Sequence, residues 1–208
     1  MKQIISLLLI AAFAFSATIH SQAAERYDLL IENARIVDGT GNPWFWGSIA
    51  IRDGKIARVG RFEAAALQTI DAKGQIVAPG FIDVHAHTED IFNNPSAENF
   101  VRMGVTSLIT GNCGGSVIDV GEFLGSFREK PLAVNLATLI AHGSVRREVV
   151  GLDNRAPSPE EQQKMVQIVE KGMQDGAVGL STGLIYVPGT FAKTEEVVEL
   201  AKVASRYG

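Results

Sequence analysis

The chain has 208 residues, of which 46% are hydrophobic and 20% are charged, and its formal net charge is −4 at pH 7. Acidic residues outnumber lysine and arginine by 23 to 19, so we expect neither a nucleic-acid partner nor binding to anionic lipid. A single cysteine excludes an intramolecular disulfide, and the composition is that of an ordinary α/β globular protein.

The N-terminal segment carries the pattern of a secretory signal peptide. A charged start at Lys2 precedes the apolar run IISLLLIAAFAF and the small-residue cleavage pattern SQA. Ser16, Thr18 and His20 interrupt the apolar run before it reaches the length of about 20 residues that a membrane anchor needs. We therefore expect residues 1–23 to be cleaved, the mature chain to be periplasmic or secreted, and no membrane attachment after cleavage.

Residues 24–75 are predicted to form a small β-sandwich segment. Two stretches of alternating apolar residues, YDLLIENARIVDG and WGSIAIRDGKIARVG, favour strands between Tyr27 and Asp71. The dipeptide of Asp53 and Gly54 in the second stretch indicates a hairpin turn. Because the segment is too small to be stable alone, we expect it to be a satellite of a larger domain.

Residues 76–208 show strands that alternate with helices. Apolar runs predict strands at 76–84, 105–110, 132–140 and 177–185, and helical patterns cover 96–103, 120–129, 158–174 and 194–208. The third helix opens with SPEE, in which Ser158 and Glu161 can form a capping box. This alternation implies parallel βαβ units.

Unusual side chains follow the ends of these four predicted strands. His85 and His87 close the first run, Cys113 lies just past the second, His142 just past the third and Tyr186 just past the fourth. Functional groups of parallel α/β folds collect beyond the carboxyl ends of the strands. We therefore expect these side chains at one rim of the sheet.

His85 and His87, in the stretch GFIDVHAHTED, are candidate metal ligands together with Cys113. Residues two apart in a strand share a face, and imidazole nitrogen and thiolate sulfur suit zinc. The alternatives are a polar turn for the histidines and a small buried hydrophobe for Cys113. Asp83 either accepts a ring N–H as a support of the site or makes backbone hydrogen bonds at the strand end.

Several motifs together resemble one protein family. PGFIDVHAH after an N-terminal β segment resembles the amidohydrolase superfamily, and GNCGG at 111–115, HGSVR at 142–146 and GLSTGLIYVPG at 179–189 resemble its D-aminoacylase (N-acyl-D-amino-acid deacylase) branch. The resemblance runs from about Tyr27 to the end of the chain. It implies an incomplete TIM-like (β/α) barrel of about four strand–helix units after the β-sandwich segment, and hydrolysis of N-acyl-D-amino acids with one or two Zn²⁺ ions.

The resemblance also implies roles for individual residues. Related hydantoinases and dihydroorotases bridge their metals with a carboxylated lysine at the end of the fourth strand, but the run 177–185 has no lysine. In the D-aminoacylase branch a cysteine takes that role, and Cys113 occupies its position. Tyr186 resembles a tyrosine that contacts the substrate carboxylate. His142 is either a pocket residue that touches the substrate or a loop histidine that bonds the backbone.

The remaining machinery that the resemblance implies lies beyond Gly208. It comprises a general acid/base aspartate and two further histidine ligands, so no catalytic acid or base is assigned within these residues. The chain would supply about half of a barrel of ~250 residues, completed by the missing half or by an oligomer partner. The favoured function is a zinc D-aminoacylase-like hydrolase, and the alternatives are a cyclic-amide hydrolase of the hydantoinase or dihydroorotase type and an inactive exported fragment that binds metal.

Overall fold

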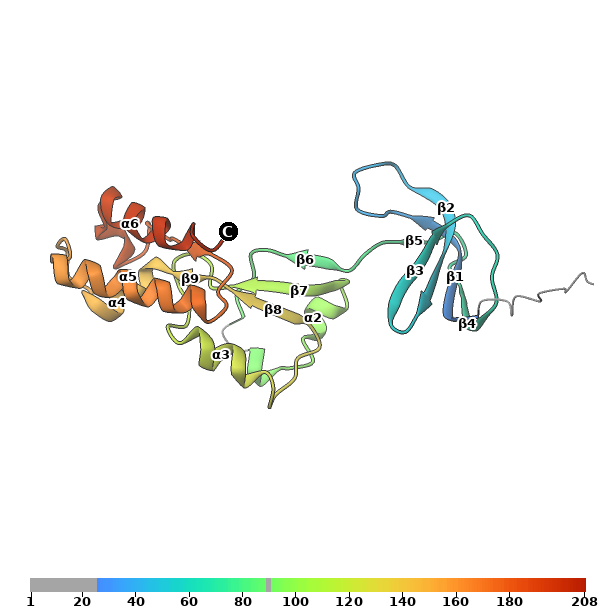
Figure 1. Cartoon of the computed structure of the whole chain (residues 1–208), viewed down its shortest axis with the longest axis horizontal. Coiled ribbons are helices and arrows are strands. Elements are labelled where there is room, and N and C mark those ends of the chain that lie inside the picture. The colour runs from blue at the N-terminus through green and yellow to red at the C-terminus, as the bar shows by residue number, and fades with distance from the viewer. Residues whose placement is uncertain (1–25, 89–90) are drawn as a thin grey trace, which may run out of the picture. The chain divides into compact units, whose positions relative to one another are not determined.

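The computed structural model describes residues 26–88 and 91–208 and divides the chain into two compact units (Figure 1). The first unit ends at Pro79 and the second begins at Gly80. The expected signal peptide, residues 1–23, lies outside the described residues. Among the helices of the described residues, none is long and apolar enough to cross a membrane.

The first unit contains one five-stranded sheet. Its strands are β1 (Tyr27–Ile36), β2 (Phe45–Arg52), β3 (Lys55–Gly60), β4 (Ala66–Asp71) and β5 (Ile76–Val77). The order is β3-β2-β1-β4, and β5 also pairs with β1. Asp53 (φ 51°) and Gly54 (φ 69°) connect β2 to β3 with left-handed backbone angles, which confirms the predicted hairpin turn. The described strands of this unit belong to one hydrogen-bonded sheet, and the predicted sandwich stays a prediction.

The second unit is an α/β fold with parallel strands. β6 (Phe81–Asp83), β7 (Val105–Thr110) and β8 (Asn135–Thr138) form a sheet in the order β6-β7-β8, and β9 (Ile140–Ala141) pairs with β10 (Leu180–Ser181). Beyond these pairs, the amide of Val178 donates to the carbonyl of Thr138 at 2.9 Å. The parallel pairing agrees with the alternation of strands and helices in the sequence.

The predicted first strand of this region, residues 76–84, is in fact two strands in two units. β5 pairs with β1 of the first unit, whereas β6 pairs with β7 of the second. Pro79 lies between them and has no backbone N–H to donate, so a continuous ladder cannot pass through it. The first unit therefore extends beyond the expected boundary at residue 75.

The α-helices follow the predicted positions with one exception, and two short 3-10 helices of the described residues lie outside those positions. The second unit contains η1 (Ile91–Asn93), α2 (Glu98–Val101), α3 (Val120–Ser126), α4 (His142–Val149), α5 (Pro159–Gln174), η2 (Gly189–Phe191) and α6 (Thr194–Ala204). The predicted capping box is present at the start of α5, where Glu161 N donates to Ser158 Oγ at 3.2 Å and Ser158 N donates to Glu161 Oε2 at 2.8 Å. The exception is α4, for which the sequence predicts no helix.

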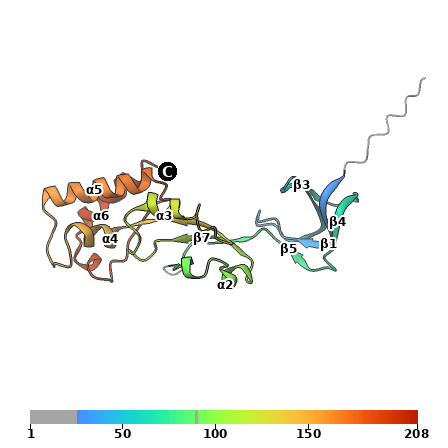
Figure 2. The same ribbon diagram turned by 90° about the horizontal axis from the view of Figure 1, so that it is seen from below.

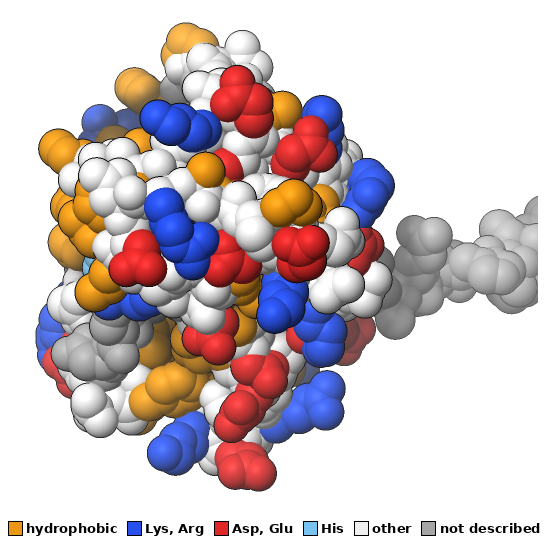
Figure 3. All heavy atoms as spheres, turned by 90° about the vertical axis from the view of Figure 1, so that its left-hand side faces the viewer, with side chains coloured by type: hydrophobic (Ala, Val, Ile, Leu, Met, Phe, Trp, Pro, Cys, Tyr) orange, Lys and Arg blue, Asp and Glu red, His pale blue; other side chains and the backbone are white. Residues whose placement is uncertain are grey.

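Figures 1 and 2 show α4, α5 and α6 gathered at one end of the second unit. Their apolar side chains form a buried cluster with the neighbouring strands that includes Ile140, Val145, Met165, Val169 and Leu200. The outer face at this end mixes acidic and basic side chains (Figure 3). This packing fixes α4 against β9, next to the candidate residues that the sequence predicts.

Candidate metal centre

The segment with both histidines follows β6 and is held through the residue between them. Ala86 is 4% exposed, and its amide donates to the carbonyl of Ile109 on β7 at 3.0 Å. Because Ala86 points into the core, His85 and His87 project outward and are exposed. Their ring centroids lie 5.7 Å apart.

Cys113 lies in a tight loop directly after β7. Its φ is 55°, and the flanking Gly111 and Gly114 have φ of 80° and 78°, so three residues of the loop adopt left-handed angles that glycine tolerates best. The buried Asn112 donates from Nδ2 to the carbonyls of Ile109 at 2.8 Å and Ala86 at 3.3 Å. Asn112 thus ties the cysteine loop to the residue between the histidines.

The loop brings the cysteine to the histidine pair. One ligand atom from each of His85, His87 and Cys113 lies within 4.8 Å of the others, and His85 Nε2 lies 3.3 Å from Cys113 Sγ. Nitrogen and sulfur ligands of a tetrahedral zinc ion lie about 3.5 Å apart, given Zn–N bonds of about 2.0 Å and Zn–S bonds of about 2.3 Å. The donor types and their spacing fit a zinc ion.

Glycines allow backbone segments to approach the cysteine loop. A Cβ on Gly183 would lie 1.9 Å from the carbonyl oxygen of Cys113, and a Cβ on Gly143 would lie 2.5 Å from that of Gly114. Real Cβ atoms do not approach so closely, so both positions need glycine. The loop is packed between the start of α4 and the segment that follows β10.

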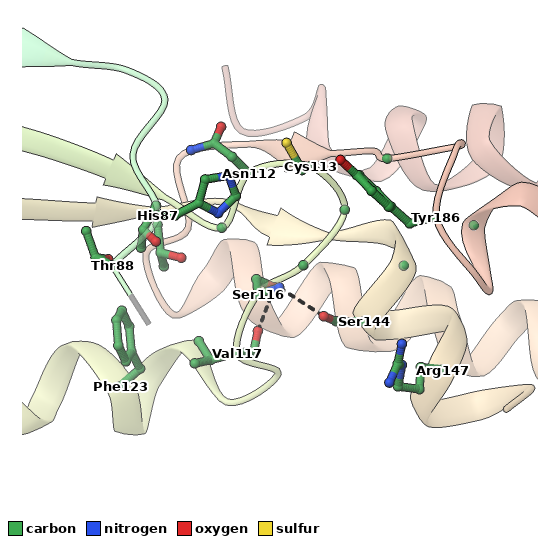
Figure 4. Close-up of a pocket in the computed structure, with 18 of the residues that line it drawn as sticks. His87, Thr88, Asn112, Cys113, Ser116, Val117, Phe123, Ser144, Arg147 and Tyr186 are labelled. Carbon is green, nitrogen blue, oxygen red and sulfur yellow. Dashed lines mark hydrogen bonds between the residues drawn. The ribbon is translucent and has the colours of Figure 1, made fainter. Parts of the chain in front are cut away.

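A cavity of about 850 Å³ opens beside the loop (Figure 4). His87, Cys113 and Tyr186 line it, and the phenol end of Tyr186, a residue that is 58% exposed, is directed toward Cys113. Among the described lining residues, Arg147 is the only lysine or arginine, and none is acidic. The cavity wall that the structure describes therefore suits a neutral or anionic ligand.

Asp83 makes a backbone hydrogen bond near the histidine pair. Its Oδ1 accepts from the amide of His85 at 3.0 Å, an arrangement typical of an aspartate that stabilises a turn. This contact corresponds to the second of the two roles considered for Asp83. It fixes the direction in which the chain leaves β6.

The sequence suggested that His142 is either a pocket residue or a loop histidine. In the structure it neither lines the cavity nor lies in a loop. It is the first residue of α4, and its ring is fully buried. Its Nε2 lies 2.8 Å from Glu196 Oε1, and Arg146 Nη1 donates to Glu196 Oε2 at 2.5 Å. Burial alone would raise the pKa of the Glu196 carboxyl, but the hydrogen bonds from His142 and Arg146 outweigh burial and hold that pKa below its usual value.

The sequence gives no assignment to three residues that shape this region: Asn112, Arg146 and Glu196. The position of Asn112 beside the cysteine in GNCGG was one available signal. His142 and Arg146 in HGSVR are four residues apart and therefore share one face of a helix. The sequence predicted no helix there, so this spacing gave no signal. Glu196 looks like an ordinary acid in the first turn of α6 until the helices are packed.

Comparison with known proteins reveals relatives along most of the chain. No family model matches. The chain is 32% identical to D-aminoacylase of Alcaligenes xylosoxydans xylosoxydans over 89% of its own length and 43% of that protein. It is 34% identical, with a TM-score of 0.80, to the N-acyl-D-glutamate deacylase of Bordetella bronchiseptica, whose crystal structure contains zinc and a phosphonate inhibitor. A D-aminoacylase with a binuclear metal centre is 28% identical, with a TM-score of 0.82.

The relatives are much longer than this chain. The region that matches is 88% of this chain but only 44% of the chain in each of these two solved structures. Their similarity nevertheless includes both sequence and fold, and D-aminoacylase has been described as a novel subset of amidohydrolases. The chain is thus homologous, over somewhat less than half of their length, to D-aminoacylase and the N-acyl-D-amino-acid deacylases of the amidohydrolase group.

Proposed function

We propose that this chain is part of a zinc-dependent hydrolase that cleaves the amide bond of N-acyl-D-amino acids. The observation that carries the proposal is the convergence of His85, His87 and Cys113 within 4.8 Å, in a chain homologous to deacylases. These three side chains would hold one zinc ion or contribute to a site for two. The products would be a carboxylate and a free D-amino acid.

Zinc held by these residues supplies a Lewis acid that polarises an amide carbonyl and activates water at neutral pH. The chain's own part is to hold the ligands in place. Asn112 and the amide of Ala86 fix the histidine segment, and the left-handed backbone of Cys113 presents the thiol from its loop. Such preorganisation limits the reorganisation that metal binding would otherwise require.

The cavity offers groups that would orient an acylated amino acid. Arg147 provides a positive charge and Tyr186 a phenol in the same cavity wall. Because the described lining residues include no carboxylate, an anionic substrate would meet attraction there rather than repulsion. We propose that these two residues bind a substrate carboxylate.

A proton carrier is still needed for this reaction. None of the described lining residues is an aspartate or glutamate, and the chain spans about 43% of its curated relative. In our proposal, the acid/base aspartate and further histidine ligands lie in a part of the protein beyond Gly208. That part would also complete a TIM-like barrel of which β6 to β10 form the first half.

The cellular location follows from the N-terminal sequence in this proposal. Residues 1–23 would direct export and be removed, which places the mature protein in the periplasm or outside the cell. N-terminal sequencing of the protein recovered from a periplasmic extract tests this. A mature terminus near Ala24 is expected, and an intact Met1 in the recovered protein would contradict it.

The metal site is tested by zinc titration of the 208-residue chain against a chromophoric chelator. His85→Ala, His87→Ala and Cys113→Ser should each weaken zinc binding strongly while the circular dichroism spectrum stays unchanged, because all three residues are at least partly exposed. Arg147→Gln is the matched control, since Arg147 lines the same cavity without being a proposed ligand. A wild-type chain that binds no zinc would overturn the proposed function.

The reaction is tested with zinc-loaded protein that includes the proposed part beyond Gly208, and with two substrates. Release of D-methionine from N-acetyl-D-methionine supports the proposal, whereas opening of hydantoin supports the cyclic-amide alternative, which the absence of a lysine in residues 177–185 disfavours. Zinc binding with neither reaction supports the third hypothesis, a metal-binding fragment. Arg147→Gln should weaken binding of an N-acyl-D-amino acid and leave zinc affinity unchanged.

A further inference from the structure

A buried cluster of charged and polar side chains lies behind the cavity wall, outside the site proposed above. It consists of His142 and Arg146 on α4 and Glu196 on α6, and it is named here the buried cluster. The side chains of His142 and Arg146 are fully buried, and that of Glu196 is 2% exposed. Charged side chains are almost never fully buried unless they are paired, because removing charges from water is costly.

The buried cluster joins separate parts of the fold. Glu196 bonds both other members, at 2.8 Å to His142 Nε2 and at 2.5 Å to Arg146 Nη1. Arg146 also donates from Nη2 to the carbonyl of Arg155 at 2.5 Å, in the loop before α5. The first turn of α6, the length of α4 and the following loop are therefore held to one another.

Held in this way, α4 makes direct contact with the cysteine loop. The amide of Ser144 donates to the carbonyl of Gly114 at 3.1 Å, one residue after Cys113. The amide of Ser116 donates to Ser144 Oγ at 2.9 Å, a bond that Figure 4 shows. Gly143 lies so close to the carbonyl of Gly114 that a Cβ would be 2.5 Å from that oxygen. The first turn of α4 is thus the surface on which the loop rests.

We propose that the buried cluster positions the Cys113 thiol by fixing the first turn of α4 against the cysteine loop. His142, Arg146 and Glu196 are positioning residues in this view, and they touch neither metal nor substrate. The chain of contacts runs from Glu196 through α4 to Gly114 and then to Cys113. The inference rests on the proposed metal site for its significance, but its geometry does not depend on a bound ion.

A purely structural ion pair would stabilise α4 without affecting the thiol, so the test needs readouts other than stability. The variant is Glu196→Gln, which keeps the shape of the side chain but removes its charge from between His142 and Arg146. Two quantities are measured under conditions in which every protein is folded by circular dichroism. They are the zinc dissociation constant of the chain and the rate at which Cys113 of the metal-free chain reacts with an aromatic disulfide.

Two controls separate charge and stability from position. Glu195→Gln makes the same charge change at an exposed neighbour in the same turn of α6. Val203→Ala removes buried methyl groups from α6 without touching the buried cluster, and it lowers stability by cavity formation. Both controls should leave zinc affinity and thiol reactivity as they are in the wild type.

Glu196→Gln is expected to weaken zinc binding about tenfold, as loss of a supporting contact behind a metal ligand typically does. It should also change the reaction rate of Cys113 severalfold. Wild-type values for both quantities, or an equal change in Val203→Ala, would overturn the inference. If the wild type binds no zinc, the proposed function fails while the thiol rates still decide the inference. If Glu196→Gln does not fold, His142→Gln takes its place with the same readouts and the same expected direction.

Discussion

The exposed histidine pair and the buried histidine show how differently one residue type is used in this fold. His85 and His87 follow a three-residue strand and have exposed side chains. His142 begins α4, is fully buried and bonds a buried carboxylate. The two environments lie on either side of the cysteine loop, which touches both.

In our proposals, the exposed histidines bind metal and the buried histidine positions the cysteine loop. The exposed imidazoles of His85 and His87 lie beside the thiol of Cys113, whereas the buried imidazole of His142 bonds Glu196 through its Nε2. The region of the helices supplies rigidity, and the region at the ends of the strands supplies donor atoms. Substitutions in either region test this separation.

The largest loss of stability is expected from Arg146→Met. Removing one member of a buried ion pair leaves the carboxylate of Glu196 in an apolar environment and should lower the free energy of unfolding by about 3–5 kcal/mol. Arg147→Met, at the exposed next residue, should change it by about 0.5 kcal/mol or less. Urea denaturation of both variants measures the difference, and equal losses would contradict the distinction between the two arginines.

Gly183→Ala should disturb the cysteine loop directly. The new Cβ would lie 1.9 Å from the carbonyl oxygen of Cys113, so the backbone must move, at an expected cost of about 3 kcal/mol. Zinc affinity should fall as well, because the displaced residue is a proposed ligand. Gly125→Ala in α3 is the control, since nothing lies within 4 Å of its Cβ position, and it should stabilise the helix by about 0.5–1 kcal/mol. Thermal melts and chelator competition measure both effects.

Asn112→Ala should have a moderate effect on both regions. It removes the hydrogen bonds to Ile109 and Ala86 and should cost about 1–3 kcal/mol, with weaker zinc binding because the histidine segment loses a restraint. The control is Asn135→Ala, which removes a bond from an exposed amide to the carbonyl of Thr106. Unchanged zinc affinity in Asn112→Ala, measured by chelator competition, would argue against this link between the loop and the histidines.

The smallest effect concerns acid stability. The pKa of Glu196 is lowered in the folded protein, so its contribution to stability is complete above the usual pKa of 4.5 and is lost as the pH falls through the lower folded value. Glu196→Gln should therefore show a shallower loss of stability below about pH 4.5 than the wild type. A hydrogen bond from Arg155 lowers the pKa of Glu161 to about 2. Because Glu161 is present in both proteins, its contribution to the pH dependence of stability cancels in the comparison. Urea denaturation at a series of acidic pH values compares the slopes, and parallel slopes would contradict the prediction.

Local signals in the sequence were sufficient for much of the fold. The hairpin at Asp53 and Gly54 and the capping box of Ser158 and Glu161 depend on residues close in sequence, and both are present as predicted. The convergence of His85, His87 and Cys113 also follows from a simple rule, because the ends of adjacent parallel strands meet. Whether these residues bind metal remains a prediction for the zinc titration.

Features that depend on packing were not predictable in the same way. α4 begins at His142 after Ala141, which offers no side-chain cap, so the usual start signal is missing. The bond from His142 to Glu196 joins residues 54 positions apart and exists only because α6 docks on α4. The prediction of one strand at 76–84 was wrong because its apolar residues belong to strands of two different sheets.

The left-handed backbone at Cys113 has a consequence for how coordination chemistry could change in such a scaffold. The loop is shaped by main-chain contacts with Gly183 and Gly143, and the cysteine side chain takes no part in them. Aspartate adopts a φ of 55° more readily than cysteine does, so an oxygen donor could replace sulfur here without rebuilding the loop. A single codon position could thereby shift the preference from soft to hard cations while the architecture stays the same.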